Sequence, residues 1–261
     1  MPSHPGSDEA PAGLAFAVLV TAAGTGERMG RRRKPYLDLA GKSILLRTLE
    51  RLSAAGGCEQ VVVVVHEEEH TAGEVARVLE RELGPVRVVP GGTTRQASAR
   101  AGLQAVGEDV PVVLIHDAVR PLVRPEVVRR VAAAALEHGA AIAAVPATET
   151  IKQVEPDGTI AVTPLRQRLW YARTPQGFRR ELIVRAHREA LGAGFEGTDD
   201  AQLVERLGLP VRVVEDSYDN IKITTDEDLA VAEALLRRQL EAPQPGGPES
   251  AGPRQTRRAS S

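Results

Sequence analysis

The sequence has a single cysteine, few lysines and no long apolar run, and each shortage excludes a class of protein. With Cys58 as the sole cysteine, no disulfide can form within the chain, which indicates a reducing compartment. No stretch approaches the roughly 20 apolar residues that a membrane-spanning helix needs. The apolar run at residues 14–23 follows Asp8 and Glu9 rather than basic residues, so it does not resemble a signal peptide. We therefore expect a cytoplasmic protein with no membrane partner.

An excess of charge of either sign is also missing, because the formal net charge is -2. A chain this neutral has no global field that would attract nucleic acid, so any anion must be held by a local cluster. The 33 basic residues include only four lysines, at positions 34, 42, 152 and 222. Arginine serves elsewhere, so each lysine is a candidate for a role that requires a compact ammonium group.

Both ends of the chain lack the apolar residues of a packed core. Residues 1–13 and 242–261 are rich in Pro, Gly, Ser and Ala, and we expect them to be disordered. The remaining residues, 14–241, are long enough for one large α/β domain.

Within this domain, short apolar runs alternate with amphipathic segments. The pattern predicts strands at 16–21, 61–66, 86–90, 111–116, 140–145 and 211–215. It predicts helices at 43–55, 68–83, 93–106, 124–138, 180–191, 199–207 and 226–240. Continuous Val and Ile runs are typical of strands that are buried on both faces. The fold class is therefore α/β, with a doubly wound, mostly parallel, Rossmann-like sheet whose ligand lies beyond the carboxyl ends of the strands.

The alternation of strands and helices breaks at about residues 148–165. Two β-like runs, 150–154 and 159–163, flank the turn sequence Glu155-Pro156-Asp157-Gly158 and predict an inserted hairpin arm. An isolated hairpin is marginally stable in water, so we expect the arm to pack on a second copy of the chain.

Two common nucleotide-binding motifs fail on spacing. A dinucleotide fingerprint starting at Gly24 requires glycine where Met29 stands, and a P-loop ending in Gly41-Lys42-Ser43 requires glycine where Tyr36 stands. What remains after the first strand is a glycine-rich turn that can cradle an anion, followed by the cations Arg28 and Lys34.

Carboxylates follow two of the predicted strands. Asp117 ends the fourth strand, where a carboxylate is a natural magnesium ligand, and its neighbour His116 is expected to be structural. Asp219 and Lys222 follow the last strand. Together with the glycine-rich turn, these residues predict a single site for a polyphosphate and a divalent cation.

Six motifs in this order resemble those of the 2-C-methyl-D-erythritol 4-phosphate cytidylyltransferases of the non-mevalonate isoprenoid pathway. The motifs are Ala22-Ala23-Gly24-x-Gly26-x-Arg28-Met29, Lys34-x-Tyr36-Leu37, Gly91-Gly92-x-x-Arg95-x-x-Ser98, Asp117-Ala118-x-Arg120-Pro121, Leu169-Trp170-x-x-x-Thr174-Pro175-Gln176 and Asp219-Asn220-Ile221-Lys222. The resemblance covers residues 15 to about 240. One departure is that the family usually has Pro-Lys-Gln-Tyr where this chain has Arg33-Lys34-Pro35-Tyr36 in a loop one residue shorter, with Arg33 as a neighbouring cation.

The resemblance implies a role for each group of residues, in a reaction that joins CMP from CTP to a polyol phosphate. Catalytic cations would be Arg28, Lys34 and Lys222. The nucleotide would contact Ala22, Ala23, Gly24, Gly26, Gly92 and Ser98. The acceptor would contact Arg120, Thr150, Lys152, Arg166, Thr174 and Thr198, with the arm residues serving the neighbouring subunit of a homodimer. Mg²⁺ would be held by Asp117 and Asp219.

Two alternatives stay open at this point. A cytidylyltransferase for another acceptor, such as ribitol 5-phosphate, would share the nucleotide motifs. A nucleotide-binding protein that has lost catalysis would also keep the fold, although it would have no need for Lys34, Asp117 and Lys222. A dehydrogenase is less favoured than either alternative, because its fingerprint fails.

Overall fold

A computed structural model of the chain describes residues 13–24 and 33–241. The expectations for residues 1–12 and 242–261, and for Gly26 and Arg28, lie outside these residues. The strands are β1 Phe16–Thr21, β2 Asp38–Leu39, β3 Lys42–Ser43, β4 Cys58–Val65, β5 Arg87–Pro90, β6 Val112–Asp117, β7 Ala140–Pro146, β8 Gln153–Val154, β9 Ile160–Val162, β10 Trp170–Arg179 and β11 Arg212–Glu215. The α-helices are α1 Ile44–Ser53, α2 Glu67–Ala72, α3 Glu74–Leu83, α4 Arg95–Ala105, α5 Pro125–His138, α6 Arg180–Gly192, α7 Asp200–Arg206 and α8 Asp226–Glu241. Short 3-10 helices occupy Lys34–Tyr36 and Arg166–Arg168.

A central sheet of seven strands has the order β11-β7-β10-β6-β1-β4-β5. Neighbouring strands are parallel except for β10, which runs antiparallel to both β6 and β7. The predicted mostly parallel α/β sheet is therefore confirmed, and all six predicted strands are present with ends shifted by a few residues. Strand β10 was not predicted from the sequence.

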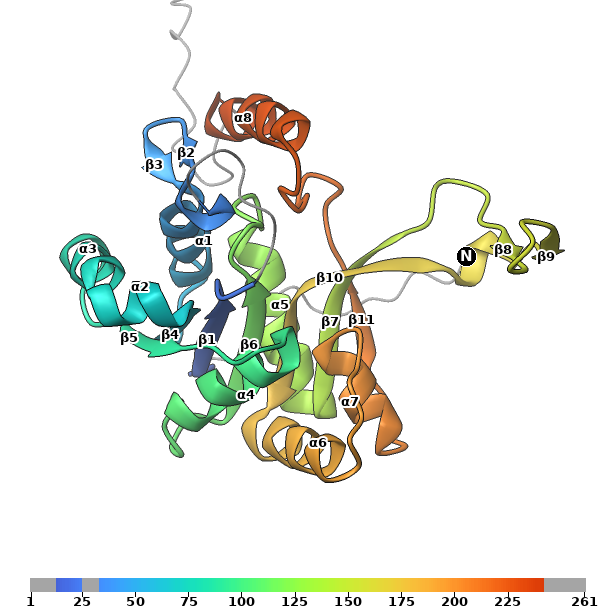
Figure 1. Ribbon diagram of the computed structural model, residues 1–261, viewed down its shortest axis with the longest axis horizontal. Coiled ribbons are helices and arrows are strands. Elements are labelled where there is room, and N and C mark those ends of the chain that lie inside the picture. Colours follow the sequence, from blue (N-terminus) through green and yellow to red (C-terminus); the bar gives the residue numbers. More distant parts are fainter. Residues whose placement is uncertain (1–12, 25–32, 242–261) are drawn as a thin grey trace, which may run out of the picture.

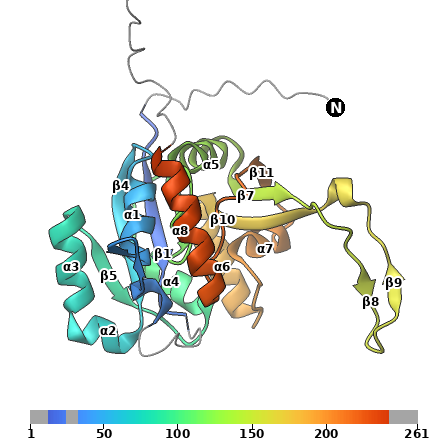
Figure 2. The ribbon, with the colours of Figure 1, turned by 90° about the horizontal axis from the view of Figure 1, so that it is seen from above.

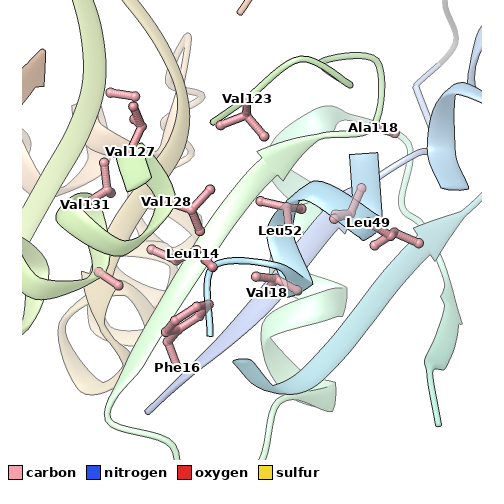
Figure 3. Packing of buried hydrophobic residues seen from close by; sticks show 14 of the residues in the cluster. Phe16, Val18, Leu49, Leu52, Leu114, Ala118, Val123, Val127, Val128 and Val131 are labelled. Carbon is pink, nitrogen blue, oxygen red and sulfur yellow. The ribbon is translucent and has the colours of Figure 1, made fainter. Parts of the chain in front are cut away.

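Helices cover both faces of the sheet (Figure 1). On one face, α1, α3 and α5 pack against the side chains of β1, β4 and β6 around Phe16, Val18 and Leu114 (Figure 3). On the other face, α4, α6 and α7 pack against Leu19, Val64 and Phe178. Because side chains alternate between the two faces of a strand, β1 contributes Val18 to one core and Leu19 to the other.

The helix predicted at residues 68–83 is wrong as a single helix. Gly73 has a left-handed backbone with φ of 64°, and its N–H donates to the carbonyl oxygens of Glu69 and His70. This is a C-terminal glycine cap, which ends α2 and allows α3 to start in a new direction.

The predicted hairpin arm is present and projects from the body of the molecule, as both views show (Figures 1 and 2). Strands β8 and β9 pair antiparallel, and across the turn the N–H of Glu155 donates to the carbonyl oxygen of Thr159 with an N···O distance of 2.8 Å. The base of the arm is closed by the N–H of Ala147, which donates to the carbonyl oxygen of Leu169. None of the helices in the described part of the chain is both long enough and apolar enough to span a membrane.

Candidate active site

A cavity lies at the carboxyl ends of β1 and β6, where the doubly wound sheet is expected to bind its ligand. Its lining residues are Thr21, Ala22, Gly24, Arg33, Lys34, Pro35, Arg95, Ser98, Asp117, Ala118, Val119, Lys222, Ile223 and Thr224. Six residues that the sequence assigned to the site are among them: Ala22, Gly24, Lys34, Ser98, Asp117 and Lys222. Among the lining residues that the structure describes, Asp117 is the sole carboxylate, whereas four are cations.

Asp117 ends β6 and is surrounded by positive charge. Its Oδ2 lies 3.1 Å from Lys222 Nζ and 3.2 Å from Arg120 Nε, and its Oδ1 lies 3.8 Å from Arg95 Nε. Burial by itself would raise the pKa of the Asp117 carboxyl, but Lys222, Arg120 and Arg95 outweigh burial and lower the pKa to about 2. The carboxylate is therefore ionised at neutral pH, and the cations around it exceed it in charge.

Hydrogen bonds fix Asp117 and the segment before Lys222 to the same point of β10. The Asp117 N–H donates to Thr174 Oγ1 at 3.1 Å, and Asn220 Nδ2 donates to the Thr174 carbonyl oxygen at 2.9 Å. Arg120 Nη1 donates to the Asn220 carbonyl oxygen at 2.9 Å. Thr174, Arg120 and Asn220 are largely buried. Their hydrogen bonds hold the end of β6 next to the segment 219–222.

The neighbouring His116 is fully buried, and its Nε2 lies 3.2 Å from the carbonyl oxygen of Arg120. Burial lowers the pKa of His116 to about 4, so the ring is neutral at pH 7. A neutral ring with its proton on Nε2 can donate to that carbonyl oxygen, which stabilises the turn after Asp117. This geometry agrees with the structural role expected from the sequence.

Gly91 allows the turn after β5 to lie directly against Ala23, which follows β1, and Gly92 allows the same turn to lie against the start of α4. A Cβ atom on Gly91 would lie 2.4 Å from the Cβ of Ala23, and a Cβ on Gly92 would lie 2.5 Å from the Cβ of Ala97. The Gly92 N–H donates to Ser98 Oγ at 3.1 Å. Ala23 and Gly92 therefore support the wall of the cavity that Ala22 and Ser98 line.

Lys34 begins a 3-10 helix that is tied to α2 through Glu69. Tyr36 donates its hydroxyl to Glu69 Oε2 at 2.9 Å, and Arg33 Nε lies 3.3 Å from Glu69 Oε1. Burial, followed by the charge of Glu69, raises the pKa of the Tyr36 phenol, so its proton stays in that hydrogen bond. Arg33 is thus paired with a carboxylate at the cavity wall, while Lys34 lies next to it in the lining.

Asp219 pairs with two arginines outside the cavity lining. Its carboxylate oxygens lie 2.6 Å from Arg238 Nη2 on α8 and 3.3 Å from Arg124 Nη2. Asp219 does not belong to the described lining of the cavity, and its carboxylate serves to attach α8 to the body of the domain. The role of Asp219 as a second magnesium ligand beside Asp117 stays a prediction.

None of the six predicted acceptor-binding residues belongs to the described cavity lining. Arg120 and Thr174 contact the lining residue Asp117, and the other four lie elsewhere. Thr150, Lys152 and Arg166 are exposed on the arm, where Lys152 Nζ donates to Thr163 Oγ1 at 2.8 Å and Arg166 Nη1 donates to the carbonyl oxygen of Thr148 at 2.9 Å. Thr198 is exposed in the turn before α7, and its N–H donates to Gln202 Oε1 at 2.8 Å. A single copy of the described chain does not bring the arm residues to the cavity, so their role stays a prediction.

Two charged residues at the site were not predicted from the sequence. Arg95 was part of a recognised motif but received no role, and Asp200 received none. Arg95 lines the cavity, and its Nη1 lies 2.8 Å from Oδ2 of the buried Asp200. The signal for Arg95 was its position at the start of the helix after β5, next to the carboxyl edge of the sheet.

Comparison with known proteins identifies a consistent set of relatives. A family model described as IspD, 2-C-methyl-D-erythritol 4-phosphate cytidylyltransferase, matches residues 16–238. The chain is 42% identical over 240 residues to the 2-C-methyl-D-erythritol 4-phosphate cytidylyltransferase of Symbiobacterium thermophilum, which covers 92% of this chain and 98% of that protein. It is 44% identical over 236 residues to the protein of the same description from Pelotomaculum thermopropionicum, covering 88% of this chain and 98% of that protein.

Solved structures with the same description share the fold. The 4-diphosphocytidyl-2C-methyl-D-erythritol synthase of Anaerococcus prevotii aligns with a TM-score of 0.77 at 34% identity, covering 87% of this chain and 97% of that chain. The 2-C-methyl-D-erythritol 4-phosphate cytidylyltransferase of Thermus thermophilus aligns with a TM-score of 0.69 at 33% identity, covering 85% and 99%. The similarity extends over nearly the whole of each relative.

Proposed function

The chain belongs to the family of 2-C-methyl-D-erythritol 4-phosphate cytidylyltransferases, and from this membership we propose its reaction. It transfers CMP from CTP to 2-C-methyl-D-erythritol 4-phosphate and releases pyrophosphate. The product is 4-diphosphocytidyl-2-C-methyl-D-erythritol. The chain is accordingly a nucleotidyltransferase.

The observation that supports this function best is the excess of cations over carboxylates at the cavity. Lys34, Arg95 and Lys222 line it together with Asp117, the one carboxylate of the described lining. A local excess of positive charge is what a triphosphate and a phosphate monoester require when they meet at one site, since both are polyanions.

The chemistry needs no general base from the protein. A phosphate oxygen of the acceptor attacks the α-phosphorus of CTP, a new P–O bond forms, and the bond to the leaving pyrophosphate breaks. The second pKa of a phosphate monoester is about 6, so this oxygen is already largely ionised at neutral pH. The protein therefore contributes positioning and stabilisation of negative charge.

Lys34 and Lys222 are the described residues placed to stabilise that charge. Both line the cavity, and Lys222 Nζ already lies 3.1 Å from an anionic oxygen, that of Asp117. Ala22, Gly24 and Ser98 form the wall on which we place the nucleoside. Arg28, which the family resemblance adds to the cations, lies outside the described residues.

A divalent cation fits the site in one specific way. Magnesium is usually bound by one or two carboxylates together with phosphate oxygens of the substrate, rather than by a cage of protein ligands. Asp117 supplies one ionised carboxylate, and no group of three or more His, Cys, Asp or Glu side chains that could hold a metal occurs among the described residues. Asp117 would hold Mg²⁺ with the nucleotide phosphates, where the ion would neutralise negative charge on those phosphates.

We further propose that two copies of the chain form a dimer through the arm. Large apolar side chains are exposed along it, including Val154 at 57%, Ile160 at 60% and Leu165 at 68% of full exposure. Several exposed apolar side chains on one projecting segment are typical of protein interfaces. A dimer would also let Thr150, Lys152 and Arg166 act on an acceptor bound by the partner subunit.

A cytoplasmic location is part of the proposal. Cys58 is a free thiol, and burial raises its pKa to about 11, so it is a poor thiolate nucleophile. A free thiol of this kind is compatible with a reducing compartment.

The function is tested by identifying the product. The purified protein is incubated with Mg²⁺, 2-C-methyl-D-erythritol 4-phosphate and, in separate reactions, CTP, UTP, ATP or GTP, and the products are analysed by phosphorus NMR and mass spectrometry. A diphosphate diester formed with CTP and at most weakly with the other nucleotides supports the proposal. Formation of the same linkage equally well from a purine nucleotide would contradict the assignment of the nucleoside site.

A further inference from the structure

Behind the cavity, three ionisable side chains from three helices form a continuous chain of polar contacts. Arg95 on α4 faces the cavity, Asp200 on α7 lies behind it, and His187 on α6 lies behind Asp200. Arg95 Nη1 lies 2.8 Å from Asp200 Oδ2, and His187 Nε2 lies 3.1 Å from Asp200 Oδ1. The role inferred below for this chain of contacts rests on the proposed function.

Asp200 is an ionised carboxylate in a fully buried position. Its exposed fraction is 1%, and that of His187 is also 1%. Burial alone would raise the pKa of Asp200, but His187 and Arg95 outweigh burial and lower it. An ionised carboxylate accepts hydrogen bonds and cannot donate them, so the proton between the two residues belongs to His187 Nε2. Burying such a charge is costly unless partners compensate it, and Arg95 and His187 are the partners that do so here.

The position of Asp200 is fixed by groups other than Arg95. Gln176 on β10, itself 1% exposed, accepts from the N–H groups of Asp200 and Ala201, both at 3.1 Å. Gln96 on α4 accepts from the Gly197 N–H at 2.8 Å and donates to the Phe195 carbonyl oxygen at 3.0 Å. The start of α7 is therefore attached to the sheet and to α4, and Asp200 is a fixed anchor rather than a side chain that follows Arg95.

Arg95, in contrast, is partly exposed and lies at the cavity. Its side chain is 33% exposed, and it is anchored at Nη1 by Asp200 while Nε lies 3.8 Å from Asp117. A guanidinium carries five N–H donors in a rigid fork, so these two carboxylates leave donors available on the cavity side. Without an anchor, a long arginine side chain has many rotamers, and ordering it on binding costs free energy.

We propose that Arg95 binds a phosphate oxygen of the nucleotide and that Asp200, held by His187, is a positioning residue that keeps the Arg95 guanidinium at the cavity before the nucleotide arrives. In this arrangement Asp200 acts on binding through Arg95 and touches no substrate. His187 acts one step further away, because it satisfies the second oxygen of Asp200.

This role differs from a purely structural one in what it predicts for nucleotide affinity. If Asp200 served packing alone, its loss would lower the stability of the fold and leave affinity for CTP unchanged in the molecules that remain folded. If Asp200 acts through Arg95, its loss weakens CTP binding, and the effect disappears once Arg95 is absent. Affinity for the acceptor is not expected to follow the same pattern.

The experiment is a double-mutant cycle read out by calorimetric binding of CTP, together with thermal unfolding. The variants are Arg95→Gln, Asp200→Asn and the double variant, in the full chain. Arg95→Gln is expected to weaken CTP binding roughly 10- to 100-fold, as for loss of a charge-assisted hydrogen bond. Asp200→Asn keeps the shape and the acceptor for His187, and is expected to weaken CTP binding about fivefold or more. In the Arg95→Gln background, Asp200→Asn is expected to have no further effect on CTP binding.

Asp199→Asn is the matched control. Asp199 caps α7 by accepting from the Gln202 N–H at 3.0 Å, and it also accepts from Gln176 Nε2 at 2.8 Å. The Asp199→Asn substitution therefore disturbs the start of the same helix but leaves the ion pair between Asp200 and Arg95 in place. It is expected to lower the melting temperature and leave CTP affinity within twofold of wild type. Arg95→Lys provides a second variant with an intact charge but no fork, and is expected to bind CTP with intermediate affinity.

The inference is overturned if Asp200→Asn leaves CTP affinity within twofold of wild type, or weakens it equally with and without Arg95. Should Asp200→Asn fail to fold, unchanged CTP affinity in Arg95→Gln would overturn the inference by itself. Failure of the proposed function has a different signature, because wild-type protein would then neither bind CTP nor release pyrophosphate from it.

Discussion

Lys222 Nζ lies 3.1 Å from Asp117 Oδ2, so two motifs that are far apart in the sequence meet at one point of the cavity. The two side chains come from the segment after β11 and from the end of β6. In this contact, the strongest candidate for a catalytic cation lies beside the strongest candidate for a metal ligand.

Replacement of Lys222 by alanine is expected to lower turnover by about 10²–10³-fold, as for other groups that stabilise charge in a transition state. Lys42→Ala is the matched control, because the Lys42 side chain has the same 45% exposure and pairs with Glu50 on the surface. Steady-state release of pyrophosphate measures both variants. Turnover of Lys222→Ala within a few-fold of wild type would show that Lys222 is not a catalytic cation.

Asp117→Asn is expected to destabilise the protein in a pH-dependent way. The pKa of Asp117 is lowered from 3.8 to about 2 in the folded protein, so its ionised form contributes stability that is fully present above about pH 4 and is lost as the pH falls towards 2. A shift of this size corresponds to roughly 2.5 kcal/mol. Urea unfolding of wild type and variant at pH 7, 5 and 3.5 gives the comparison.

The difference in unfolding free energy between the two proteins should be constant from pH 7 to 5 and smaller at pH 3.5. A difference that stays constant down to pH 3.5 would mean that Lys222, Arg120 and Arg95 do not depress the Asp117 pKa as the geometry indicates.

Glu69 is expected to position Lys34 by holding the residues on either side of it. Glu69 accepts from the Tyr36 hydroxyl and from the His66 N–H and pairs with Arg33. Glu69→Ala should therefore lower stability by about 1–3 kcal/mol and weaken CTP binding. Glu69→Gln keeps the hydrogen-bond acceptor but loses the charge facing Arg33, so it should be the milder of the two. CTP affinity is measured by calorimetry. Equal affinity in wild type and Glu69→Ala would show that Glu69 on α2 does not position Lys34 for CTP binding.

Charged residues on the arm are expected to break the proposed dimer. Ile160 and Val162 lie on β9 with 60% and 47% exposure, so the double replacement Ile160→Glu with Val162→Glu should have little effect on the core. Leu191→Glu, at a 56% exposed position on α6, is the control. Sedimentation velocity at micromolar concentration should give a dimer for wild type and control and a monomer for the arm variant. A monomeric wild type would contradict the dimer and the shared acceptor site.

Much of the fold follows from the sequence because most strands carry unbroken Val and Ile runs. Strand β10 was missed since Pro175 and Gly177, which normally interrupt strands, lie within it. Gly177 is required because a Cβ there would lie 2.8 Å from Leu114 Cδ2 and 2.9 Å from Val131 Cγ1, so helix α5 packs directly on this strand. Such a requirement depends on packing between distant segments and has no local signature.

The candidate site was predictable to the extent that strand ends converge. Asp117 and Lys222, which were assigned to one site because both come after strands, line the same cavity. Ser98, which the family resemblance alone assigned, lines it as well. The ion pairs of Asp219 with Arg124 and Arg238 were not predicted, because these partners come from the residue before α5 and from α8, and ion pairs between distant elements cannot be read from spacing. Asp200 was missed for the same reason.

The central claim is most directly tested by Mg²⁺- and CTP-dependent pyrophosphate release with two acceptors, 2-C-methyl-D-erythritol 4-phosphate and ribitol 5-phosphate. We expect a strong preference, in kcat/KM, for 2-C-methyl-D-erythritol 4-phosphate. A preference for ribitol 5-phosphate would contradict the proposed acceptor while leaving the cytidylyl transfer intact, and no pyrophosphate release with either acceptor would contradict the proposed activity itself.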